Sequence, residues 1–129
     1  MSDQQTSRQQ LVALLTPLLP KTWKVMPFSR DFGVLSQVTV MVHMTNITQS
    51  PAAPRGALLT EYTVSVFDPQ TDPERAQGAL DDEVLELIHA ISSLPGGIVW
   101  DSAEPVLFSN SLGWDIKVTA TTTTSGKDA

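Results

Sequence analysis

An acidic stretch in the second half of the chain is the first candidate for chemistry. Residues 66–91, VFDPQTDPERAQGALDDEVLELIHAI, carry seven carboxylates and a single basic residue, Arg75. Paired carboxylates can perform acid–base catalysis or hydrolyse glycosides. Asp81 and Asp82 are adjacent, however, so a helix would point them to different sides, and no base or nucleophile lies beside them. The pattern therefore favours a helix with a solvated acidic face over a catalytic site.

The same stretch contains the local signals that begin and end a helix. Asp72 precedes Pro73, which suits the first helical position, so Asp72 is predicted to be the N-cap. The apolar residues that follow a 3.6-residue period are Ala76, Leu80, Val84, Leu87, Ile88 and Ile91. LPGG at 94–97 is predicted to stop the helix. Capping, the helix dipole and solvent exposure explain the carboxylates, and a small metal-dependent enzyme with its site in residues 68–86 is kept as an alternative.

Other residue types that support catalysis or metal binding are sparse. The two histidines, His43 and His89, belong to no H-x-x-x-H, H-E-x-x-H or Cys/His spacing. The absence of cysteine excludes disulfides and thiolate metal sites. No nucleophile elbow, Walker loop or dinucleotide fingerprint is present. We therefore expect no enzymatic activity, no metal and no cofactor, and we expect Trp23, Trp100 and Trp114 in the core or in subunit contacts.

The charge of the chain is acidic and unevenly distributed. The 129 residues carry a formal net charge of -6. Residues 1–60 hold five basic and two acidic side chains, a balance of +3, whereas residues 61–129 hold three basic and twelve acidic side chains, a balance of -9. A chain with so few lysines and arginines is not expected to bind nucleic-acid phosphates strongly. No apolar run reaches the roughly 18 residues of a membrane span, so no membrane association is expected.

The elements that must position any site are predicted in the order α-β-β-β-α-β-β. Leu11, Leu14, Leu15 and Leu18 form one apolar stripe of a first helix. TWKVMPF is a short strand candidate that Pro27 closes. Period-2 alternation indicates strands in QVTVMVHMT, EYTVSVF and GWDIKVTAT, with Ser65 and Asp115 on the polar faces of the last two, and GIVWDSAEPVLFS suggests one or two strands interrupted near Pro105. Strands buried on one side are typical of an antiparallel or mixed sheet. The predicted fold is therefore α+β, a single mixed or antiparallel sheet with two helices on one face, in one domain at 1–121 with a flexible polar tail at 122–129.

Several segments together resemble a known family. They are LPKTWKVMPFSRDFGVLSQVTVMV at 19–42, the proline loop SPAAPRGA at 50–57, the acidic stretch at 66–91, and VLFSNSLGWDIKVTAT at 106–121. In order and spacing they resemble the tail terminator proteins of long, non-contractile-tailed phages, in the form found among actinobacterial phages. The likeness covers roughly residues 8–121.

The resemblance implies a structural virion protein rather than an enzyme. Members of the family form a homohexameric ring at the head-proximal end of the tail tube, stop addition of the major tail protein, and offer a docking surface to the head connector or completion protein. Genomic DNA passes through the central hole without specific binding. Another neck component, such as a head completion or connector adaptor protein, is the alternative.

A terminator needs surfaces that accept one partner and refuse another. A proline loop can do this because proline removes a backbone donor and blocks strand addition. The residues nominated for subunit or partner contacts are Arg30 and Asp31 in SRDFG, and Pro51, Pro54 and Arg55 in the proline loop.

Overall fold

A computed structural model of the chain describes residues 7–26, 35–49, 57–70, 72–94, 97–108 and 111–123. Its elements, in chain order, are α1 (Ser7–Leu15), the 3-10 helix η1 (Thr16–Leu18), β1 (Lys24–Met26), β2 (Thr39–Gln49), β3 (Ala57–Phe67), α2 (Pro73–Ser92), β4 (Ile98–Phe108) and β5 (Ser111–Thr123). This order and the α+β class confirm the prediction from the sequence.

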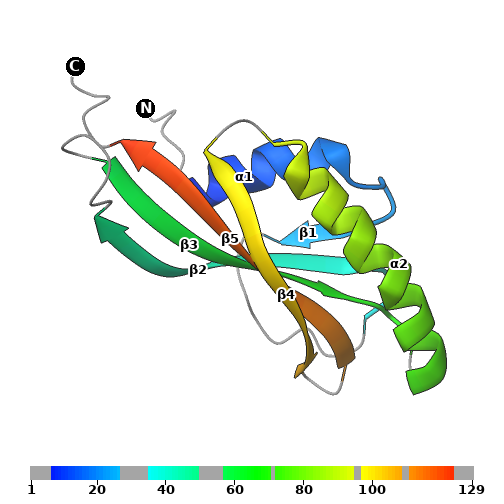
Figure 1. Ribbon diagram of the computed structural model, residues 1–129. Coiled ribbons are helices and arrows are strands. Elements are labelled where there is room, and N and C mark those ends of the chain that lie inside the picture. The colour runs from blue at the N-terminus through cyan, green and yellow to red at the C-terminus, as the bar shows by residue number, and fades with distance from the viewer. Residues whose placement is uncertain are drawn as a thin grey trace.

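The strands form one five-stranded sheet in the order β1-β2-β3-β5-β4. β1 pairs with β2 in parallel, and the other three pairings are antiparallel, so the sheet is mixed. β2, β3 and β5 run beside one another over most of their length, and they extend past the helices at one end of the molecule (Figure 1). The last of the described strands, β5, thus lies inside the sheet, and among these strands β4 and the short β1 form its two edges.

Both helices pack on one face of the sheet, as predicted (Figure 1). The alternating residues of β2, β3 and β5 that point to this face are buried, which confirms the predicted strand patterns. The main core consists of Leu11, Leu15, Leu19, Val40, Val42, Tyr62, Val64, Val66, Leu80, Val84, Leu87, Ala90, Ile91, Leu94, Ile116, Val118 and Ala120. A second, smaller cluster of Met26, Met41 and Phe67 lies on the opposite face.

Helix α2 begins and ends where its local signals indicate. The Asp72 side chain accepts a hydrogen bond from the backbone N–H of Glu74 at 3.4 Å, and Pro73 occupies the first turn. Ser93 is the C-cap, directly before Leu94. Gly97 then adopts a φ of 94°, a left-handed conformation that glycine tolerates without steric cost. The carbonyl of Gly97 accepts from the N–H of Thr121 at 2.8 Å, which joins the start of β4 to β5.

The prediction for the first helix is wrong in its detail. Leu11, Leu15 and Leu19 face the core, whereas Leu14 and Leu18 are 42% and 44% exposed. The α-helical winding ends at Leu15 and tightens into the 3-10 turn, which contains Pro17. Leu19 follows this turn in an extended conformation, so the helical period no longer sets its direction, and Leu19 rather than Leu18 is buried in the core.

Two further expectations about the late strands need correction. Pro105 does not interrupt β4, because an edge strand can place a proline on its unpaired side. The irregularity is instead a bulge between Trp100 and Ser102. β5 extends to Thr123, so the first two residues of the expected polar tail belong to the sheet.

None of the helices in the described part of the chain combines the length and the apolar character needed to cross a membrane.

Candidate functional site

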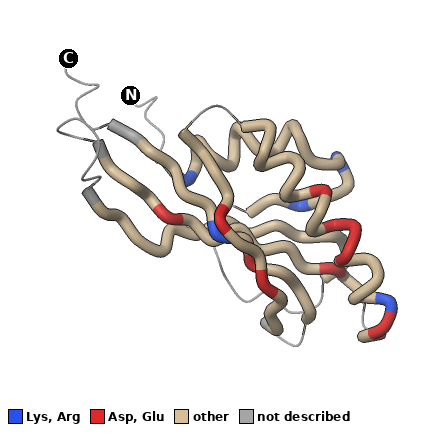
Figure 2. The backbone as a smooth tube through the Cα atoms, in the orientation of Figure 1, with Lys and Arg blue, Asp and Glu red and all other residues tan. Residues whose placement is uncertain are grey.

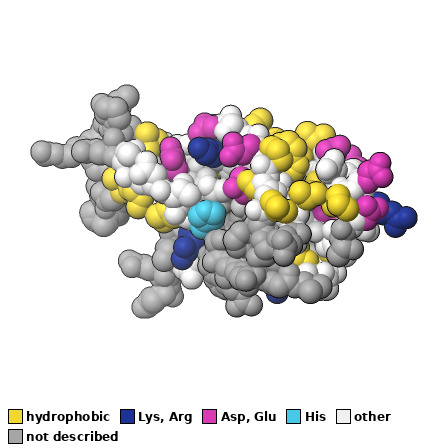
Figure 3. Space-filling view, turned by 90° about the horizontal axis from the view of Figure 1, so that it is seen from below, with side chains coloured by type: hydrophobic (Ala, Val, Ile, Leu, Met, Phe, Trp, Pro, Cys, Tyr) yellow, Lys and Arg dark blue, Asp and Glu magenta, His cyan; other side chains and the backbone are white. Residues whose placement is uncertain are grey.

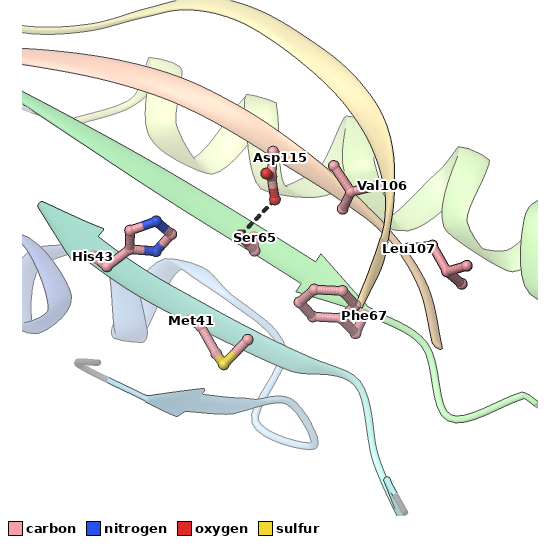
Figure 4. A pocket seen from close by; sticks show the side chains of 7 residues that line it. All are labelled: Met41, His43, Ser65, Phe67, Val106, Leu107 and Asp115. Atoms are coloured by element: carbon pink, nitrogen blue, oxygen red, sulfur yellow. Dashed lines mark hydrogen bonds between the residues drawn. The ribbon is translucent and has the colours of Figure 1, made fainter. Parts of the chain in front are cut away.

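The face of the sheet opposite the helices carries a groove that crosses four strands (Figure 4). It encloses about 330 Å³ and is lined by Met41, His43, Ser65, Phe67, Val106, Leu107 and Asp115. These residues come from β2, β3, β4 and β5, and the outward-pointing register of each strand brings them together. The groove is therefore a product of sheet pairing, which places residues far apart in the sequence side by side.

A short hydrogen bond orients the polar part of the groove. The Ser65 hydroxyl donates to Oδ1 of Asp115 at 2.6 Å, between residues that are direct partners across β3 and β5 (Figure 4). Ser65 is buried and Asp115 is half-buried. Nearby on β2, Nδ1 of His43 is buried and has no hydrogen-bond partner within the described residues. The groove thus combines apolar walls with an oriented carboxylate and an imidazole.

This arrangement does not activate a nucleophile. In a Ser-His-Asp triad the imidazole lies between the hydroxyl and the carboxylate, takes the proton from the hydroxyl and is oriented by the carboxylate. Here Ser65 donates directly to Asp115 instead. The hydrogen bond fixes the carboxylate in one orientation, which suits a surface that contacts another molecule.

The same helix-free face is acidic around one lysine. Glu61, Asp101, Glu104 and Asp115 lie on β3, β4 and β5, with Lys117 between them on β5. Figure 3 views the molecule from below the sheet and shows acidic side chains gathered around a basic one. Asp101 lies at the bulge, where its Oδ2 accepts from the Thr119 hydroxyl at 3.0 Å. Two of the four carboxylates are thus held by hydroxyl groups of neighbouring strands.

A pair of carboxyl groups, those of Asp68 and Glu83, links the end of β3 to α2. Asp68, which is only 4% exposed, follows β3 and accepts a hydrogen bond from the N–H of Gln70 at 2.8 Å. Burial raises the pKa of Glu83, a hydrogen bond to Asp68 and the charges of Asp68 and Asp82 act in the same direction, and together they bring it to about 8. Glu83 is consequently protonated at neutral pH and can donate to Asp68. Its Oε1 atom is buried without a partner among the described groups.

The absence of a metal site in the acidic stretch stays a prediction. Within the described ranges, no group of three or more histidine, aspartate or glutamate side chains is arranged to hold a metal ion. A protonated Glu83 is also a poor cation ligand, because ligating carboxylates must be ionised. Asp81, Asp82 and Glu86 are exposed on α2, in line with the expectation of a solvated face.

The residues nominated from the sequence fall into two groups. Asp72 caps α2. Arg30, Asp31, Pro51, Pro54 and Arg55 lie outside the described residues, so their contact role stays a prediction.

Sequence reasoning missed both carboxyl arrangements. The polar alternation of β3 and β5 identified Ser65 and Asp115 as outward-facing, but their register, and hence their hydrogen bond, was not encoded in either strand alone. Glu83 lies among exposed acidic residues of α2, and nothing in the local sequence indicates that it is partly buried and bonded to Asp68.

Comparisons with known proteins give a structural likeness but no sequence match. No protein-family model and no curated protein sequence matches the chain. Among solved structures, the fold is similar to that of the PVC sheath/tube terminator of an extracellular contractile injection system in its extended state. The TM-score is 0.46 at 14% sequence identity, over 95% of this chain and 58% of that chain. This chain therefore spans less than two thirds of that protein, and no functional conclusion follows from a likeness of this size.

Proposed function

We propose that this protein is a structural virion protein, the terminator of a phage tail. It forms a homohexameric ring at the head-proximal end of the tail tube of a long, non-contractile-tailed phage. The ring stops polymerisation of the major tail protein and joins the head through a connector or completion protein. The proposal begins from the sequence segments at 19–42, 50–57, 66–91 and 106–121, which resemble that family in order and spacing.

The structural observation that carries the proposal is the acidic helix-free face. Four carboxylates around the single ammonium group of Lys117 repel a phosphate backbone rather than bind it. A channel for DNA needs this property, because a wall that bound phosphates would hold the genome during its passage. We therefore propose that this face of each subunit lines the central hole of the ring. The helices α1 and α2 then lie on the outer side.

The proposal assigns no chemistry to the protein. The Ser65–Asp115 pair orients a carboxylate on the wall of the channel, and the acidic face of α2 is solvated. No cofactor, metal or membrane is required.

Electron microscopy of particles made without this gene tests the proposal. Overlong tails of variable length without attached heads are expected, because length control and head joining fail together. A plasmid copy of the wild-type gene is the control and restores uniform tails with heads. Detached heads with tails of normal length would instead indicate another neck component, and intact particles would overturn both readings.

A further inference from the structure

The two edges of the sheet differ in sequence, length and neighbours. At one edge, the three-residue β1 pairs with β2, and α1 packs over β2. At the other edge, the eleven-residue β4 pairs with β5, and α2 packs over β3, β4 and β5. We call these the α1–β1 edge (residues 7–26) and the α2–β4 edge (residues 72–94 and 97–108). They lie on opposite sides of the subunit.

The two edges carry opposite charge (Figure 2). The α1–β1 edge contains three basic and no acidic side chains, namely Arg8, Lys21 and Lys24. The α2–β4 edge contains one basic side chain, Arg75, and eight acidic ones: Asp72, Glu74, Asp81, Asp82, Glu83, Glu86, Asp101 and Glu104. Lys21 and Lys24 are exposed, as are most of the carboxylates. The uneven charge of the sequence is therefore also a separation in space.

Each edge also exposes large apolar side chains. On the α1–β1 edge, Leu14 and Leu18 flank the buried stripe of α1. On the α2–β4 edge, Trp100 is 40% exposed and Leu107 is 68% exposed. Trp100 points to the helix side of β4, because it pairs with the inward-facing Val118, whereas Leu107 lines the groove on the helix-free face.

A groove runs between α2 and β4. It encloses about 340 Å³, and its lining residues are Gln77, Leu80, Asp81, Pro105, Leu112, Gly113 and Trp114. Pro105, which is exposed, is the β4 residue in the apolar wall of this groove. Asp81 adds a carboxylate from the helix. An apolar side chain flanked by a cation matches this combination.

The backbone of β4 discourages the alternative of simple strand addition. Proline lacks the N–H group that a new strand would need, and a bulge interrupts the regular spacing between Trp100 and Ser102. Contact at this edge is therefore expected through side chains in the groove.

We infer that the α1–β1 edge of one copy docks onto the α2–β4 edge of the next copy. Leu14 and Leu18 enter the groove beside Pro105, while Lys21 and Lys24 face Asp81 and Glu104. Such a contact joins two different surfaces, so it is heterologous and propagates from subunit to subunit. Its closure into a ring rests on the proposed function, whereas the contact itself rests on the charges and apolar residues described above.

Reciprocal charge reversal tests the contact in the full-length protein. The first variant is Lys21→Glu with Lys24→Glu, and the second is Asp81→Lys with Glu104→Lys. Each alone should lose the oligomer, because like charges then meet across the interface. An equimolar mixture should regain it, since each variant offers the edge that the other can bind. Glu61→Lys, an exposed reversal on β3 away from both edges, is the matched control and should assemble normally.

Assembly is measured by sedimentation of the purified protein and by electron microscopy of the protein added to purified tail tubes. Circular dichroism establishes that each variant is folded. Oligomers that persist in both reversal variants would overturn the inference, and so would a failure of the mixture to recover in both assays. A wild-type protein that self-associates in neither assay would overturn it as well.

The two proposals fail separately. If gene deletion gives overlong headless tails but charge reversal leaves assembly intact, the proposed subunit contact is wrong and the proposed terminator function is kept. If charge reversal controls self-association but gene deletion leaves intact particles, the proposed subunit contact is kept and the proposed terminator function is wrong.

Discussion

The two faces of the sheet are made from alternate residues of the same strands, yet they bury different types of side chain. The helix-covered face buries aliphatic side chains and Tyr62 under α1 and α2. The helix-free face buries Met41 and Phe67, but also Thr63 and Ser65. Burial of apolar area stabilises the fold on the first face. Buried polar groups on the second face cost stability unless they are paired, and Ser65 meets this need by donating to Asp115.

The largest expected effect lies on the helix-covered face. Leu87 is fully buried in α2, so Leu87→Ala should lower the free energy of unfolding by about 2–5 kcal/mol through lost transfer energy and a residual cavity. Leu85, on the same helix, is 63% exposed, and Leu85→Ala is the control, expected to change stability by less than about 0.5 kcal/mol. Urea unfolding of both variants measures the difference. Equal losses would mean that α2 is not packed through the Leu87 side.

The helix-free face has one tightly packed point at Gly113. A Cβ atom there would lie 2.4 Å from the Phe67 ring and 2.5 Å from the backbone oxygen of Val66. Gly113→Ala should therefore destabilise by about 1–3 kcal/mol, because the backbone cannot move aside easily. Gly78→Ala is the matched control: nothing lies within 4 Å of its new Cβ, and alanine should stabilise α2 by about 0.5–1 kcal/mol. In thermal unfolding, Gly113→Ala should lower the Tm and Gly78→Ala should raise it.

The Ser65–Asp115 hydrogen bond is the next smaller effect. Ser65→Ala removes the donor and should cost about 1 kcal/mol, with up to roughly 3 if the carboxylate cannot be solvated. A double-mutant cycle with Asp115→Ala isolates the interaction between the two groups. Purely additive losses would show that the 2.6 Å contact contributes nothing beyond its separate groups.

The protonated Glu83 gives the smallest expected effect, and its sign depends on pH. Its pKa rises from 4.5 to about 8 on folding, so the native state binds more protons than the unfolded state between those values. Stability from this group therefore falls as pH rises through that window and is constant above it. Glu83→Gln cannot ionise and should be more stable than the wild type at pH 8, by on the order of 1 kcal/mol because the side chain is only partly buried.

Chemical denaturation at several pH values checks this effect. The stability difference between Glu83→Gln and the wild type should shrink towards about pH 4.5. The exposed Glu86→Gln is the control and should follow the wild-type curve. A difference that does not vary with pH would contradict the protonated pair.

The sequence predicted an element well where its local signals agreed with one another. Helix α2 has a cap, a proline, a 3.6-residue period and a stop, and all agree with its observed extent. The strands around Val40, Val64 and Ile116 alternate because one face is covered by helices. The apolar stripe predicted for the first helix is wrong at Leu14 and Leu18, because the buried positions of α1 are Leu11 and Leu15 and the α-helix ends before Leu18.

The site was harder to predict than the fold, because it depends on register between distant strands. Ser65 meets Asp115, and Glu83 meets Asp68, only after β3 has been aligned with β5 and α2. In neither pair does the sequence around one residue indicate which residue it will contact. The separation of positive and negative charge was visible in the sequence, but the strand order was needed to place the two signs on opposite edges.

The position of β5 between β3 and β4 also sets the order of events during synthesis. Among the described strands, β4 pairs with β5 alone, and β5 leaves the ribosome last. The α2–β4 edge therefore cannot be complete until residues 111–123 have emerged and inserted beside β3, a pairing between distant segments that forms slowly. The edge strand β4 is consequently one of the last of the described elements to gain its partner. If the proposed contact is correct, each copy must complete this pairing before its α2–β4 edge can bind a neighbour.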